Sequence, residues 1–175
     1  MSRERQPSQI SFLTPEDAQI VHMMRCFLSE ASRIYETRRG TPLEDPVVMT
    51  EPRDVYEFLR LEMADLEQEQ MRVLNLTTKH HVISAPTIYQ GTVSGTPVRV
   101  AEVFRPAIIN GAASIIVAHN HPSGDPTPSA DDIATTRNLV AAGKLLDIEV
   151  LDHIVIASSG FVSLNERGLA EFGRR

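Results

Sequence analysis

Two histidines separated by one residue stand at the end of an apolar run. His119 and His121 follow the segment Ser114 to Ala118, which is apolar on both faces and therefore typical of a buried central strand. Side chains alternate between the two faces of a strand, so both imidazoles point to the same side. Because this is a usual way to present two nitrogen ligands to one tetrahedral metal ion, the spacing predicts part of a metal site.

The loop after the second histidine can bring an oxygen ligand to the same place. It contains three prolines and one glycine, so it is stiff and turn-rich, and it returns the chain towards the strand end. Ser129 then opens a helix, and Asp132 lies in the first turn of that helix. Two histidines and an aspartate would leave the fourth position of a zinc ion free for water, which is the pattern of a catalytic site.

Each part of this pattern also has a simpler interpretation. Ser129 and Asp132 match a helix-capping pattern, which explains both residue types and is compatible with a metal ligand. The two histidines could instead form hydrogen bonds with the loop, but the combination of the three features favours the metal site. Asp125 and Asp131 compete with Asp132 as the oxygen ligand. Neighbouring residues on a helix point about 100° apart, so only one of Asp131 and Asp132 can serve.

The pattern His-x-His, seven residues, then Ser-x-x-Asp resembles the signature of the JAMM (MPN+) metalloproteases. Further segments are similar to the RadC-type branch of that family; they are Gly91-Thr92, Asn120, His121-Pro122-Ser123-Gly124, Pro128-Ser129 and Leu151-Asp152-His153. The resemblance runs from about Val55 to Leu169. It implies an α/β fold of the JAMM/MPN type, like that of cytidine deaminases, in which helices flank a curved mixed sheet.

The resemblance also assigns roles to individual residues. His119, His121 and Asp132 would bind zinc, and the hydroxyl of Ser129 would support the attacking water and the oxyanion. His153 is not part of the signature. It has two equally weighted interpretations: it orients one of the metal ligands, which metal sites usually need, or it is simply a buried core histidine.

A glutamate far upstream is expected to act as the general acid and base. The family places it just before the first core strand, and there the match falls on Glu69, two residues before Met71. Glu102, on a predicted helix before the histidine strand, is the alternative. The residues alone would favour a simpler interpretation, in which Glu67 and Glu69 are solvated charges at a helix end.

The periodicity of the whole sequence predicts the elements that must position these residues. Helices are expected over 14–39, 52–67, 98–109, 133–146 and the last ten residues, with Pro106 kinking or shortening the third; strands are expected over 71–76, 82–83, 88–93, 114–118, 149–157 and 161–164. Residues 1–50 would form a helical N-terminal arm and linker, and residues 51–175 the JAMM/MPN domain. The arm has an apolar stripe that would allow a homodimer.

Charge and composition disfavour several functional classes. The chain of 175 residues carries 17 Lys and Arg against 23 Asp and Glu, and its net charge of -6 disfavours non-specific binding to nucleic acids. The single cysteine, Cys26, excludes a disulfide scaffold and a cysteine-rich zinc finger, and it fits a reducing compartment. The longest strongly apolar run is far too short to cross a bilayer, and no signal sequence is visible. We therefore expect a cytoplasmic protein without membrane contact.

These observations favour one function and leave two alternatives. The favoured function is a zinc-dependent hydrolase that cleaves amide bonds of a peptide, an isopeptide or a protein tail, with Glu69 transferring the protons. The first alternative is an accessory factor in DNA repair, which the RadC resemblance suggests and the acidic charge disfavours. The second alternative is a binding module in which zinc only stabilises the fold.

Overall fold

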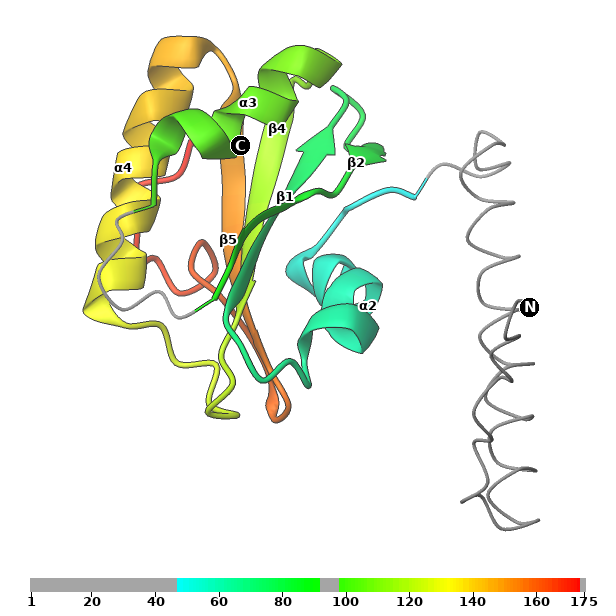
Figure 1. The fold of residues 1–175 in the computed structure, drawn as a ribbon. Coiled ribbons are helices and arrows are strands. Elements are labelled where there is room, and N and C mark those ends of the chain that lie inside the picture. Colours follow the sequence, from blue (N-terminus) through cyan, green and yellow to red (C-terminus); the bar gives the residue numbers. More distant parts are fainter. Residues whose placement is uncertain (1–46, 92–97, 174–175) are drawn as a thin grey trace, which may run out of the picture. The chain divides into compact units, whose positions relative to one another are not determined.

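The computed structural model describes residues 47–91 and 98–173. Within them, one mixed sheet runs in the order β2-β1-β4-β5-β6, and β3 also pairs with β1 (Figure 1). Its strands are β1 (Gln70–Leu76), β2 (Val82–Ser84), β3 (Thr87–Gln90), β4 (Ser114–Asn120), β5 (Glu149–Ala157) and β6 (Gly160–Ser163). The central pair, β4 and β5, is parallel, whereas the other strand pairs are antiparallel. The predicted α/β fold with a mixed sheet is confirmed.

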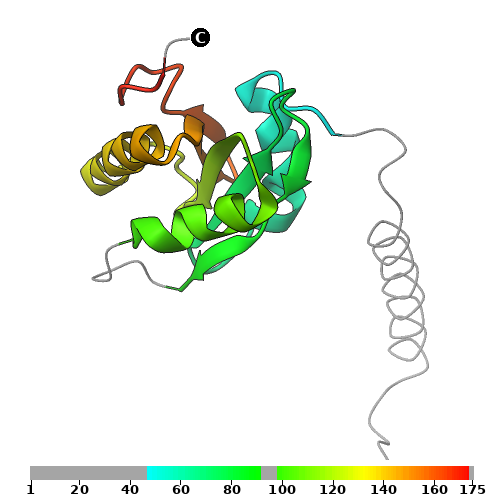
Figure 2. The same ribbon diagram turned by 90° about the horizontal axis from the view of Figure 1, so that it is seen from above.

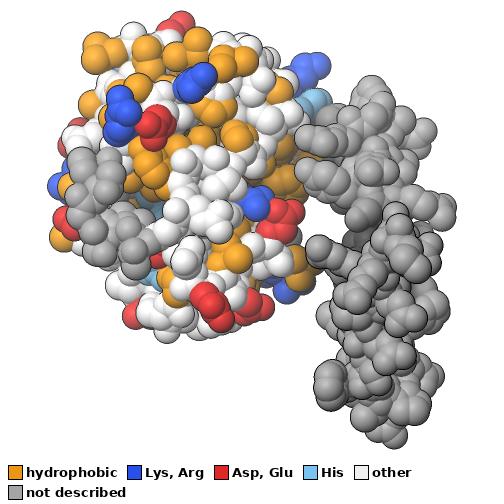
Figure 3. Space-filling model, in the orientation of Figure 1, with side chains coloured by type: hydrophobic (Ala, Val, Ile, Leu, Met, Phe, Trp, Pro, Cys, Tyr) orange, Lys and Arg blue, Asp and Glu red, His pale blue; other side chains and the backbone are white. Residues whose placement is uncertain are grey.

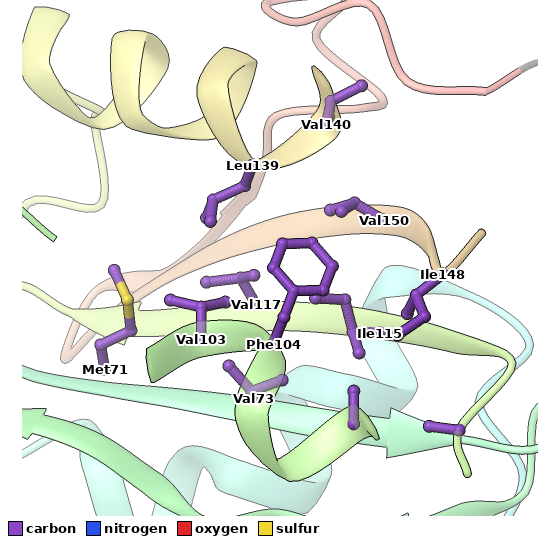
Figure 4. Close-up of a cluster of buried hydrophobic side chains, with 12 residues drawn as sticks. Met71, Val73, Val103, Phe104, Ile115, Val117, Leu139, Val140, Ile148 and Val150 are labelled. Carbon is purple, nitrogen blue, oxygen red and sulfur yellow. The ribbon is translucent and has the colours of Figure 1, made fainter. Parts of the chain in front are cut away.

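Helices cover both faces of this sheet (Figures 1 and 2). They are α2 (Pro52–Met63), α3 (Val100–Asn110) and α4 (Ala130–Leu146). Helix α2 packs on one face, where Val55, Leu59 and Met63 recur every four residues and are buried. Helices α3 and α4 pack on the other face and share a core with the sheet, in which Phe104 of α3 and Leu139 of α4 lie over β4 and β5 (Figure 4).

Strand β4 is buried along its whole length and contributes to both cores. Ile115 and Val117 belong to the core under α3 and α4, whereas Ile116 and Ala118 belong to the core under α2. The strict alternation is that of a central strand with both faces covered. The same alternation places the next residue of β4, His119, on the face that α3 and α4 cover.

Several predicted elements differ from those observed, and the helix predicted over residues 52–67 ends at Met63. Pro106 does not shorten α3, which runs to Asn110 and is capped by Gly111, whose φ is 61°; a proline has a helix-compatible φ, although it removes one helical hydrogen bond. Helix α4 begins at Ala130, directly after the cap predicted at Ser129 and before the start that periodicity alone predicted at residue 133. The helix predicted for the last ten residues is wrong for residues 166–173, which form turns and irregular chain. Gly168 interrupts that segment with a φ of 63°.

The first described residues, which the sequence assigns to the linker, lie against the domain. The carbonyl of Val47 accepts a hydrogen bond from the N–H of Val82 at 2.9 Å, and the N–H of Met49 donates to the carbonyl of His80 at 3.0 Å. Met49 is also buried, with 2% of its surface exposed. The predicted helix over residues 14–39, its proposed role in a homodimer and Cys26 lie outside the described residues.

The surface of the described domain carries some exposed apolar side chains. The C-terminal turns of α3 and α4 contribute Ile108, Ile109, Leu145 and Leu146, and Figure 3 shows hydrophobic side chains gathered over that end of the domain. None of the helices in the described ranges is long and apolar enough to cross a bilayer.

Candidate metal centre

The end of β4 carries both histidines on the sheet face that α3 and α4 cover. The alternation along β4 directs His119 to that face. His121 lies just beyond the strand, but its N–H still bonds to the carbonyl of Ile156 in β5 at 2.8 Å, which extends the strand pairing by one step. The two imidazoles are therefore side by side, with their ring centroids 4.8 Å apart.

The loop after His121 returns the chain to the same end of the sheet, where α4 begins (Figure 1). Ser129 is the N-cap of α4, and its Oγ accepts the N–H of Asp132 at 3.1 Å. Asp132 reciprocates, because its Oδ2 accepts both the N–H and the hydroxyl of Ser129, each at 2.7 Å. The predicted capping box is present, and it aims the carboxylate of Asp132 at the histidines.

Three ligand atoms meet at this point. His119 Nε2 lies 3.3 Å from Asp132 Oδ1, His121 Nε2 lies 3.6 Å from Asp132 Oδ2, and the two Nε2 atoms are 2.9 Å apart. All three ligand atoms lie within 4.8 Å of one another. Among the described residues this is the group of histidines, cysteines and acids that could hold a metal ion.

The structure also separates the competing aspartates. The side chain of Asp125 accepts the N–H of Thr127 at 2.9 Å and so stabilises its own loop. Asp131 is exposed on the first turn of α4; it lines the cavity beside His119 but is not a member of the ligand group. Only Asp132 joins the two imidazoles.

The donor set fits a zinc ion in a further respect. His121 Nδ1 lies 2.9 Å from the backbone carbonyl of Asp125. A carbonyl can only accept, so His121 carries a proton on Nδ1, and its Nε2, which faces Asp132, is the nitrogen that can bind a metal. His119 likewise uses Nδ1 for another partner, His153, at 2.8 Å. Two Nε2 atoms and a carboxylate around one point, with the remote nitrogens held by hydrogen bonds, form a donor set typical of zinc.

Mutual attraction dominates the electrostatics of this group. Burial alone would raise the pKa of Asp132, but hydrogen bonds with His119, His121 and Ser129 outweigh it and hold that pKa well below its usual range. The hydrogen bond with Asp132 raises the pKa of His121, although burial acts in the opposite direction. Without a metal the carboxylate therefore favours a proton on His121, and a metal ion would displace that proton on binding.

A cavity of about 220 Å³ opens beside the ligand group. Its wall includes His119, Asp132 and the half-buried Glu69, together with the apolar side chains of Met71, Tyr89 and Val98. Glu69 therefore lies on the wall of the cavity that His119 and Asp132 also line. A larger cavity beside α2, of about 330 Å³, contains none of the three ligands.

The alternative general base is held elsewhere. Glu102 lies on α3 and accepts a hydrogen bond from Arg99 Nη1 at 3.1 Å. It is not among the residues that line the cavity beside the ligands. The structure thus brings Glu69, and not Glu102, to the site.

The residue between the two histidines holds the backbone on both sides of Glu69. Asn120 is fully buried; its Oδ1 accepts the N–H of Gln70 at 2.7 Å, and its Nδ2 donates to the carbonyl of Gln68 at 3.1 Å. A third bond runs from the N–H of Gly91 to the carbonyl of Glu69 at 3.0 Å. The sequence analysis named Asn120 only as part of the family resemblance and missed this function.

His153 is buried in the core and also contacts a candidate ligand. It is 1% exposed and pairs through Nε2 with His119, while its Nδ1 lies 2.6 Å from the hydroxyl of Thr136. Burial lowers the pKa of His153 well below its ordinary value, so the ring is neutral. Thr136, the second partner, was not singled out by the sequence.

Comparison with known proteins identifies relatives of the whole described domain. Residues 49–169 match the family described as the RadC-like JAB domain. A UPF0758 protein of Roseiflexus castenholzii is 50% identical over 127 residues, which are 73% of this chain and 54% of that protein. A UPF0758 protein of Chloroflexus aurantiacus is also 50% identical over 127 residues, covering 73% and 56%. One from Desulfitobacterium hafniense is 44% identical over 144 residues, covering 81% and 63%.

These relatives are longer than the matching part of the chain. The chain spans between about half and two thirds of the length of the curated relatives it matches. Their names state no activity, substrate or partner, so the chemistry must be argued from the residues of the site.

Proposed function

Since the chain belongs to the RadC-like JAB domain family, we propose that it is a zinc-dependent hydrolase of amide bonds in peptides or isopeptides. One observation carries the proposal. His119, His121 and Asp132 converge on one point, and Glu69 lies on the wall of the cavity beside that point. Three protein ligands with an adjacent carboxylate are what metal-assisted hydrolysis requires, because one ligand position stays open and a base stands beside it.

The residues of the chain would divide the work as follows. His119, His121 and Asp132 hold the zinc ion, which when bound lowers the pKa of a water molecule to about 7. The carboxylate of Glu69 accepts the proton of the attacking water and later delivers it to the departing amine.

Ser129 would contribute its hydroxyl to the oxyanion that develops on the substrate. In the structure that hydroxyl donates to Asp132 Oδ2 at 2.7 Å. Binding of a cation would draw charge from the carboxylate and weaken this bond, so the hydroxyl could rotate towards the substrate. Ser129 is exposed, which leaves room for that rotation.

The proposed substrate is an extended peptide or protein tail. Tyr89 and Gly91 line the cavity at the end of β3. Among the described strands, β3 pairs with β1 alone, so its outer edge offers free backbone N–H and C=O groups. An extended chain can add to such an edge through main-chain hydrogen bonds, and this would lead its scissile bond past the apolar wall of the cavity to the ligands.

Paired glutamate variants test the proposal. Glu67 and Glu69 lie two residues apart, but Glu67 is exposed and does not line the cavity, so Glu67→Gln is a matched control for Glu69→Gln. The full chain is loaded with zinc, its metal content is measured, and cleavage is followed on a panel of peptides and lysine isopeptides. We expect wild type and Glu67→Gln to cleave, and Glu69→Gln to bind zinc equally but to cleave about 10²–10⁴-fold more slowly.

Other outcomes would contradict the proposal. Full zinc occupancy without cleavage of any substrate by wild type would remove the enzymatic role, as would equal activity of Glu69→Gln. The hypothesis of a purely structural zinc makes a different prediction: His119→Ala would destabilise the protein, and Glu69→Gln would change nothing measurable.

A further inference from the structure

Two buried side chains connect the backbone of one candidate metal ligand with the ring of another. Thr136 lies one turn after Asp132 on α4 and is 0% exposed. Its Oγ lies 2.6 Å from the backbone carbonyl of Asp132 and 2.6 Å from His153 Nδ1. His153 Nε2 lies 2.8 Å from His119 Nδ1. These contacts form one continuous chain of hydrogen bonds from Asp132 to His119.

The direction of every hydrogen bond in this chain follows from its first member. The carbonyl of Asp132 can only accept, so the single hydroxyl proton of Thr136 points to it. Thr136 Oγ can then only accept from His153, which places a proton on His153 Nδ1.

A neutral imidazole carries one N–H, so His153 Nε2 must be an acceptor. His153 is buried, and neither of its two partners is a carboxylate that would favour a second proton. The proton between the two rings therefore belongs to His119 Nδ1. His119 Nε2 is left with a lone pair, which points to His121 and Asp132.

The opposite direction would disable the site. If the hydroxyl of Thr136 pointed to His153 Nδ1, then His153 Nε2 would donate to His119, and the proton of His119 would lie on Nε2. That proton would occupy the position from which the ring binds a metal. The carbonyl of Asp132 excludes this arrangement, since it would face the oxygen of Thr136 at 2.6 Å with no proton between them.

We propose that Thr136 and His153 are positioning residues that hold His119 in the Nδ1–H tautomer and so keep its Nε2 ready for a divalent metal ion. The inference rests on the proposed function, because only a metal site gives this tautomer a purpose. The tautomer of His119 itself is a property of the metal-free chain. The proposal also gives Asp132 a second function. Its carboxylate is a candidate metal ligand, and its backbone carbonyl determines the position of the proton on a second candidate ligand, His119.

Substitutions at Thr136 test the inference. Thr136→Val keeps the shape of the side chain and removes the hydroxyl, whereas Thr136→Ser restores a hydroxyl. Ser114→Ala is a matched control, since Ser114 is a buried hydroxyl at the far end of β4 that has no hydrogen-bond partner among the described residues. Two quantities are measured on each full chain: the tautomers of the histidines in the metal-free state, from long-range ¹⁵N–¹H correlation spectra, and the zinc affinity, from competition with a chelator.

We expect wild type, Thr136→Ser and Ser114→Ala to show His119 with its proton on Nδ1. Thr136→Val should shift His119 towards the Nε2–H tautomer and weaken zinc binding about 10-fold or more, as loss of a partner of a metal ligand commonly does. Thr136→Ser should recover an affinity within about 2- to 3-fold of wild type. A structural role alone would lower the midpoint of unfolding without moving the tautomer signals.

The inference and the proposed function fail in different ways. An Nε2–H tautomer of His119 in metal-free wild type overturns the inference, whether or not zinc binds and even if Thr136→Val does not fold. Equal zinc affinity of folded Thr136→Val and wild type also overturns it. Failure of wild type to bind zinc, with the Nδ1–H tautomer present, would instead support the hydrogen-bond chain and contradict the proposed metal-dependent function.

Discussion

Replacing Ser129 separates its role as a helix cap from its proposed role in catalysis, because alanine and glycine differ as N-caps while both lack the hydroxyl. Ser129 Oγ accepts the N–H of Asp132 at 3.1 Å, and this bond is lost in either variant. An alanine at this position costs about 1 kcal/mol of stability, whereas glycine costs only roughly a few tenths. Ser129 is exposed, so no buried cavity adds to the cost. We expect Ser129→Ala to lower the free energy of unfolding by about 1 kcal/mol, and Ser129→Gly by clearly less.

Catalysis should follow a different order from stability. If the hydroxyl supports the oxyanion, both variants lose the same donor, which typically costs about 2.7–4 kcal/mol of barrier, or about 10²–10³ in kcat. Stability is measured by urea denaturation and kcat by initial rates at full zinc occupancy, with Ser123→Ala, an exposed serine of the same loop, as control. The reasoning is refuted if either variant keeps the wild-type kcat, since Ser129 would then be a cap alone. It is equally refuted if the kcat values of the two variants differ as their stabilities do.

Two further predictions concern buried polar residues. Asn120→Ala removes both side-chain hydrogen bonds that hold the backbone around Glu69, so it should lower the free energy of unfolding by about 2 kcal/mol. It should also lower kcat at unchanged zinc occupancy. An unaltered kcat in the folded variant would contradict this role. Burial raises the pKa of Asp152, even though Ser163 and two backbone N–H groups donate to it. Its contribution to stability is therefore complete below the unfolded pKa of about 3.9 and is lost as the pH rises through the higher folded pKa. In urea denaturation at a series of pH values, the free energy of unfolding of wild type should fall relative to that of Asp152→Asn as the pH rises through this range. A difference between the two that stays constant or changes in the opposite direction would show that the pKa shift is absent.

Local patterns predicted the ligand group, because its geometry depends on short-range rules. Strand alternation places His119 and His121 on one face, and a capping box fixes Asp132 at the start of α4. Glu69 is different. The sequence alone marked it as a solvated charge, and only the family resemblance selected it. Its place depends on the register between β1 and β4, in which Met71 lies opposite His119.

The supporting residues could not be predicted for the same reason. Asn120 reaches Gln68 and Gln70 across about 50 positions of the chain, and Thr136 reaches His153 between α4 and β5. These contacts form only when the helix and the strands pack together, so the hydrophobic periodicity of the sequence does not predict them. The error at the C-terminus has a local cause: a glycine with positive φ, Gly168, stops a segment whose composition would otherwise permit a helix.

The members of the site differ in how far their chemistry can be separated from the fold. Asp132 completes the capping box of α4, faces both imidazoles and accepts a hydrogen bond from Thr136 at its carbonyl, so a substitution there changes stability, metal affinity and proton positions together. Glu69 is held through its backbone, by Gly91 and by bonds of Asn120 to its neighbours, whereas its side chain has no hydrogen-bond partner among the described residues. Glu69 is thus a half-buried carboxylate without a side-chain hydrogen bond among the described residues, on the wall of a cavity that it shares with His119 and Asp132, and this fits its proposed role as the base. Loss of activity in Glu69→Gln at unchanged stability is therefore the most direct evidence that this chain could give of catalysis.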